Sequence, residues 1–191
     1  ETNAQQIVVQ LEGIAFTVGP HAWMSVLIDG ASPTFIGCEF VAAQGDVGPV
    51  VDIYDGSHPV FEDCLFEDNN GIWVPIVGVG EDASLRMEAC RFEDNAPLRG
   101  GIGARGSLTL VDCVFDGFTV AEVDGFISFV PNQPGPTMVI DRCRFLNAAE
   151  GSMSTGKIIY AGGATTVTNT LIAHSSFDQE LSGEYTMTYD G

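Results

Sequence analysis

A triplet of the form Cys-x-Phe recurs five times along the chain and constrains the fold more than any other feature. Successive cysteines are 26, 26, 23 and 30 residues apart, and degenerate copies begin at Ile14 and Thr170. Seven copies with a mean period of 26 residues predict a solenoid, in which each repeat forms one coil and contacts only its neighbours. The five complete triplets begin at Cys38, Cys64, Cys90, Cys113 and Cys143.

Each triplet follows a strand signal and a bend signal. An apolar residue stands three positions before every copy, and the residue directly before the copy is Gly, Asp or Asn in five of the seven. These three residue types tolerate a left-handed backbone, so we expect a tight bend at that position. The seven bend residues are Gly13, Gly37, Asp63, Ala89, Asp112, Arg142 and Asn169.

A third short segment completes each repeat. Residues 50–54 and 126–130 are clear strand patterns, residues 100–106 are a glycine-rich version, and residues 185–189 are expected to end the seventh coil. No segment has a helical period. The sequence therefore predicts an all-β parallel β-helix of about seven coils, with three short strands per coil, in a single domain over residues 1–191.

The cysteines and phenylalanines of the triplets should form the interior. Residues two apart on a strand face the same side, so Cys and Phe turn inward together while the residue between them faces out. Buried cysteine behaves as a small apolar residue, and we expect a hydroxyl at that position to have no obvious partner. The odd number of cysteines and the absence of a CxxC or Cys/His pair argue against zinc. The predicted core ladder is Cys38, Cys64, Cys90, Cys113, Cys143, Phe40, Phe66, Phe92, Phe115 and Phe145.

The amino-acid composition argues against two kinds of partner, nucleic acid and the membrane interior. Seven basic and 26 acidic residues give a formal net charge of −19, which repels phosphate backbones, so nucleic acid is not an expected partner. No apolar run approaches the ~18 residues of a membrane span, so membrane insertion is not expected either.

The repeat resembles a known group of proteins. An apolar residue, a two-residue bend, Cys-x-Phe and a glycine-rich third strand look like the right-handed parallel β-helix repeats of polymorphic outer-membrane proteins and related bacterial surface proteins. The segments 162–164 and 168–173 are similar to these repeats as well. The resemblance implies a right-handed coil and an extracellular or cell-surface location, and it implies no catalytic residue.

Polysaccharide cleavage is the main enzymatic alternative, because many parallel β-helices act on acidic polysaccharides. The polygalacturonase elements Asn-Thr-Asp, Asp-Asp, Gly-His-Gly and Arg-Ile-Lys are missing from the chain. A lyase-like set of Asp52, Asp55 and Arg105 can be proposed, although the spacing does not force these residues together. We therefore expect no catalytic residues and no cofactor other than, at most, calcium.

Calcium is suggested by acidic residues after the phenylalanines. Aligned coils would stack Glu67, Glu93 and Asp116 in one column, with Asp68 beside Asp94. Like charges directly opposite each other on paired strands are destabilising, so these side chains either splay into water or share a hard cation.

The sequence thus favours a non-catalytic structural, adhesive or scaffold β-helix of a bacterial surface protein. A polysaccharide-binding or polysaccharide-cleaving domain is the alternative, and a glycan would use an aromatic platform. Candidates for that platform are Trp23, Trp73, Tyr54 and Tyr160.

The ends of the chain suggest assembly. Residues 189–191 match residues 28–30 and 54–56, where a new coil begins, so the chain is expected to contain a whole number of coils. Two explanations fit a chain that ends where a new coil begins. The chain is either a segment of a longer solenoid or a subunit that stacks end to end into an oligomer or filament.

Overall fold

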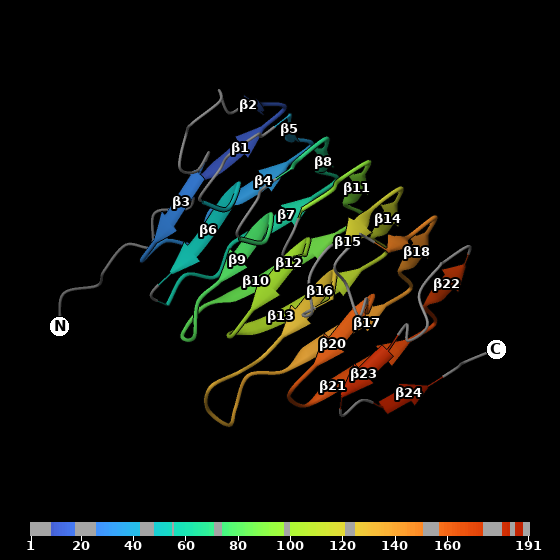
Figure 1. Cartoon of the computed structure of the whole chain (residues 1–191). Coiled ribbons are helices and arrows are strands. Elements are labelled where there is room, and N and C mark those ends of the chain that lie inside the picture. The colour runs from blue at the N-terminus through green and yellow to red at the C-terminus, as the bar shows by residue number, and fades with distance from the viewer. Residues whose placement is uncertain are drawn as a thin grey trace, which may run out of the picture.

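The computed structural model describes residues 9–17, 26–42, 48–54, 56–70, 74–97, 100–120, 125–150, 157–173, 181–183 and 186–188. These residues form a stack of coils in which three parallel sheets run along the length of the molecule (Figure 1). The described residues contain strands, bends and turns but no helix. The all-β parallel solenoid with three strands per coil is therefore confirmed.

The sheets are built by taking one strand from each coil in turn. The first sheet contains β1 (Gln10–Glu12), β4 (Thr34–Ile36), β7 (Val60–Glu62), β10 (Ser84–Glu88), β13 (Ser107–Val111), β17 (Met138–Asp141), β21 (Thr165–Thr168) and β24 (Thr186–Thr188). The second sheet contains β2 (Ala15–Thr17), β5 (Glu39–Val41), β8 (Leu65–Glu67), β11 (Arg91–Glu93), β14 (Val114–Asp116), β18 (Arg144–Leu146) and β22 (Leu171–Ala173). The third sheet contains β3 (Val26–Asp29), β6 (Val51–Tyr54), β9 (Val77–Val79), β12 (Ile102–Ala104), β16 (Ile127–Phe129), β20 (Ile159–Ala161) and β23 (Leu181–Gly183). A separate pair joins β15 (Thr119–Val120) to β19 (Ala149–Glu150).

The coil count differs slightly from the expected seven. The first sheet has eight strands, whereas the other two have seven each. The sequence pattern places a third strand at residues 185–189, but β24 pairs with β21 in the first sheet, and β23 is the third strand of the seventh coil. The assignment was wrong because short strands with the same period-2 pattern look alike whichever sheet they join. The expected whole number of coils is therefore incorrect, since β24 begins another one.

The predicted bends are present in all seven coils. The backbone φ is positive at every expected position, between 49° and 62°, including Ala89 and Arg142, which are not residues that favour this conformation. A second left-handed bend, two residues after each Phe, was not predicted. It lies at Ala42, Asp68, Asp94, Gly117 and Asn147.

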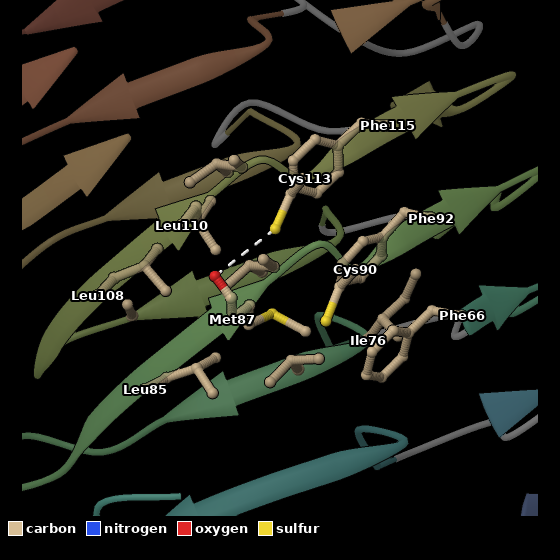
Figure 2. Packing of buried hydrophobic residues seen from close by; sticks show 14 of the residues in the cluster. Phe66, Ile76, Leu85, Met87, Cys90, Phe92, Leu108, Leu110, Cys113 and Phe115 are labelled. Atoms are coloured by element: carbon tan, nitrogen blue, oxygen red, sulfur yellow. Dashed lines mark hydrogen bonds between the residues drawn. The ribbon is translucent and has the colours of Figure 1, made fainter. Parts of the chain in front are cut away.

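The interior is a stack of aromatic rings beside a column of thiols. Successive triplet phenylalanines are stacked, with ring centroids 4.7 Å apart for Phe40 and Phe66 and 4.5 Å apart for Phe66 and Phe92. All five cysteines are free and buried. Figure 2 shows Cys90 and Cys113 pointing inward beside the rings of Phe92 and Phe115.

Two buried asparagines close the corner after the second sheet in coils three and four. The Asn69 side-chain amide donates to the carbonyl of Phe40 at 2.8 Å, and the Asn95 amide donates to the carbonyl of Phe66 at 2.8 Å. The backbone N–H of Asn69 in turn donates to Oδ1 of Asn95 at 3.0 Å. This ladder satisfies buried backbone groups at the bend, a role that the sequence analysis missed.

The part of the chain that the structure describes holds no helix long and apolar enough to cross a membrane.

Candidate functional site: a groove on the third sheet

A groove of about 530 Å³ lies on the outer face of the third sheet. This volume falls within the range of typical small-ligand sites. Its lining comes from five successive coils, because the outward positions Asp52, Gly78, Gly103, Ser128 and Tyr160 follow one another in register. The remaining lining residues are Tyr54, Val74, Pro75, Val79, Gly80, Ala104, Arg105, Val130 and Asn132.

Two glycines make the floor of the groove possible. A Cβ on Gly78 would lie 2.7 Å from the Oδ1 atom of Asp52, and a Cβ on Gly103 would lie 2.8 Å from the Cγ atom of Pro75. Side chains from neighbouring segments thus lie across the bare backbone of these two coils. The glycine-rich third strand therefore serves the site as well as the fold.

Asp52 lies at one end of the groove and is 9% exposed, although it points away from the core. Burial raises the pKa of its carboxyl above the ordinary value, and hydrogen bonds with the Tyr54 side chain and the Ile53 backbone partly offset this effect. Tyr54 itself remains 45% exposed, so one end of the groove offers a tyrosine ring to solvent.

A long turn forms one wall. Residues 130–137 connect β16 to β17, and the side-chain amide of Asn132 in this turn donates to the Glu81 carboxylate of a turn two coils away. Gln133 donates in the same way to Asp82, at 3.4 Å. Coil four, the shortest coil, lies between these two turns. Its Arg105 side chain is exposed beside the turn of residues 130–137.

Tyr160 lies at the far end of the groove. The Lys157 ammonium nitrogen is 4.7 Å from the centre of its ring, a cation–π contact. The two ends of the groove thus carry a tyrosine each, and the coils between them contribute glycines together with both apolar and polar side chains.

The sequence pointed to several of these residues without indicating that they meet. Asp52 and Arg105, named as a lyase-like set, and Tyr54 and Tyr160, named as an aromatic platform, all line this one groove. Trp23, Trp73 and Asp55 lie outside the described residues. Ser128 was not predicted because only the register of the third sheet brings it to the site, and Asn132 was not predicted because it lies on the long turn after β16.

The acidic column on the second sheet has the expected register. Glu67 aligns with Glu93, and Glu93 with Asp116. Glu93 pairs with Arg91 at 2.9 Å, and the Asn147 amide donates to Oδ1 of Asp116 at 2.7 Å, so neighbouring side chains reduce the repulsion.

The bend residues Asp68 and Asp94 are exposed beside this column. The described residues contain no group of three or more His, Cys, Asp or Glu side chains placed to hold one ion. Calcium binding by this column stays a prediction, which titration calorimetry with Ca²⁺ would test.

The fold defines the class of protein as a parallel β-solenoid, and the groove lies on the outer face of its third sheet. No protein-family model matches the chain, and no curated protein matches it significantly. Among solved structures, it is similar to two trypsin-treated variants of QnrB1, a plasmid-mediated fluoroquinolone resistance protein, at 11% sequence identity in each case. The matches cover 94% and 95% of this chain and 92% and 90% of the other, with TM-scores of 0.24 and 0.26. At these scores the similarity carries no argument about function.

Proposed function

We propose that this protein is a non-catalytic adhesive β-solenoid of a bacterial surface protein, and that it binds a glycan in the groove on the third sheet. The observation that carries the proposal is the convergence of Tyr54, Tyr160, Asp52, Arg105 and Asn132 on one groove. Tyrosine presents an apolar face and a polar hydroxyl, which suits the apolar and hydroxyl-bearing faces of a sugar ring. Convergent polar groups then fix the orientation of the ligand.

Binding is favoured over hydrolysis by the number of carboxylates. Glycoside hydrolases use a pair of Asp or Glu side chains that flank the scissile bond. Asp52 is the sole carboxylate among the described residues that line the groove. Polysaccharide cleavage remains the alternative, and chromatography of a polysaccharide incubated with the protein distinguishes the two by the appearance of shorter products.

The surface location is proposed from the repeat resemblance and the formal net charge of −19. Such a charge keeps a protein soluble and repels nucleic acid. Antibody labelling of intact cells that express the protein would test this part, and labelling that requires permeabilised cells would contradict it.

A glycan array followed by titration calorimetry tests the binding function. Wild-type protein should bind at least one class of glycan, and Tyr160→Ala should lower the affinity at least tenfold. Leu171→Ala is the control, because Leu171 is an exposed apolar residue on the second sheet, away from the groove. Absence of binding to any glycan, or equal affinity of Tyr160→Ala and wild type, would contradict the proposal.

A further inference from the structure

We propose that the groove takes a linear acidic oligosaccharide laid along the solenoid axis, with Arg105 binding a carboxylate of the ligand. This inference rests on the proposed glycan binding and adds the shape and charge of the ligand.

The shape follows from the coils that line the groove. Tyr54 belongs to the second coil and Tyr160 to the sixth, so four coil steps separate them. At ~4.8 Å per step, the groove extends over about 19 Å along the axis. A site of this length across the strands suits an extended chain of several sugar units rather than a single ring.

The charge expected of the ligand depends on which charged side chains at the groove already have a hydrogen-bond or ion-pair partner within the protein. Asp52 is buried and hydrogen-bonded to Tyr54, Glu81 accepts a hydrogen bond from Asn132, and Asp82 accepts one from Gln133. These three described carboxyl groups at or beside the groove therefore accept hydrogen bonds within the protein.

Arg105 shares with Arg144 the absence of an ion pair among the described residues, and unlike Arg144 it lines the groove. Arg86 pairs with Glu88, Arg91 with Glu93 and Arg142 with Asp112, each at 2.8–2.9 Å. Among the described residues, the Arg105 guanidinium has no such ion pair, although the chain has 26 acidic residues.

Arg105 also has a central position. It lies on the fourth coil, midway between the coils of the two tyrosines, and its exposed fork of donors matches a carboxylate in a bidentate arrangement. Lys157 adds a second positive charge beside Tyr160. The net negative charge of the whole chain does not prevent this binding, since charges more than about 8 Å apart are largely screened at physiological ionic strength.

Calorimetry with galacturonate oligomers of one to six units, and with the methyl ester of the tetramer, tests the inference. We expect affinity to rise with length up to about the tetramer and then to level off. We expect the free-acid tetramer to bind at least tenfold more tightly than its ester. Arg105→Gln should abolish the preference, so that the acid and the ester bind with equal affinity.

Arg144→Gln is the matched control, because Arg144 is an exposed arginine on the second sheet and its loss changes the net charge by the same amount. It should keep the preference. Equal binding of acid and ester, a preference that survives in Arg105→Gln, or a monomer that binds as tightly as the tetramer would each overturn the inference. If the array shows glycan binding under those outcomes, the proposed function stands alone; if no glycan binds, both fail.

Discussion

The hydroxyl of Thr170 donates to the carbonyl of Thr168 at 2.8 Å, and this hydrogen bond takes the place of a thiol contact made in the preceding coils. In those coils, Sγ of Cys64 lies 3.4 Å from the carbonyl of Glu62, and Sγ of Cys113 lies 3.4 Å from that of Val111. The cysteine column therefore supplies a donor to the carbonyl two residues earlier, at the left-handed bend. The expectation that a hydroxyl has no partner there was wrong.

This contact predicts the ranking of substitutions at Cys64. Cys64→Ser should change the free energy of unfolding by less than about 1 kcal/mol, because the hydroxyl keeps the hydrogen bond. Cys64→Ala should cost about 1–2 kcal/mol, because it removes both the donor and the sulfur volume. Urea denaturation of the two variants measures the difference, and a serine variant less stable than the alanine variant would contradict this role of the thiol.

The phenylalanine stack should carry much of the stability. Phe66 is fully buried between Phe40 and Phe92, so Phe66→Ala leaves a cavity with stacked rings on both sides and should cost about 3–5 kcal/mol. Phe16→Ala is the control, because Phe16 is only partly buried. Its cost should be clearly smaller in the same denaturation experiment, and equal costs would argue against a continuous interior stack.

Ala89 offers a test of the bends. Its φ of 53° is a conformation that costs a non-glycine residue about 1–2 kcal/mol, so Ala89→Gly should raise the free energy of unfolding by up to about 1 kcal/mol. Ala149→Gly, at an exposed position of strand β19, should instead lower it by roughly 0.5–1 kcal/mol. The bend interpretation predicts opposite signs for the two variants, and the same sign in both would refute it.

Asp52 should make stability depend on pH. Burial raises the pKa of its carboxyl, so the folded protein holds the proton more tightly than the unfolded chain does. The stabilising contribution of the protonated carboxyl is fully present below the ordinary pKa of about 4 and is lost as the pH rises through the folded pKa.

Asp52→Asn keeps an acceptor for Tyr54 but cannot ionise. Its melting temperature should therefore exceed that of wild type at neutral pH, and the two values should converge as the pH falls. Calorimetric melts across the acidic range measure this. A difference that stays constant with pH would show that ionisation of Asp52 does not weaken the fold.

Much of the fold could be predicted because its signals are local and repeated. The left-handed bends directly before each triplet, the inward Cys and Phe columns and the three strands per coil follow from side-chain alternation and from backbone preferences within a single repeat. Assigning a strand to its sheet was harder to predict at the end of the chain, because the pattern of residues 186–188 fits either the first or the third sheet.

The site was predicted only in parts, because it depends on relations between coils. Arg105 and Asp52 lie 53 positions apart, and both line one groove only because the third sheet stays in register over coils of unequal length. The turn that carries Asn132 reaches across a whole coil to Glu81, which no pattern within one repeat indicates.

Blocking the groove tests the central claim most directly. Ser128 faces outward within the groove, next to Tyr160, so Ser128→Trp should fill the groove without disturbing the core, whereas Thr166→Trp places the same ring on the exposed face of the first sheet. Calorimetric titration with the glycan that wild type binds most tightly should show binding lost in Ser128→Trp and kept in Thr166→Trp, with both variants folded by circular dichroism. A folded Ser128→Trp protein that binds the glycan as wild type does would contradict the assignment of the groove as the binding site.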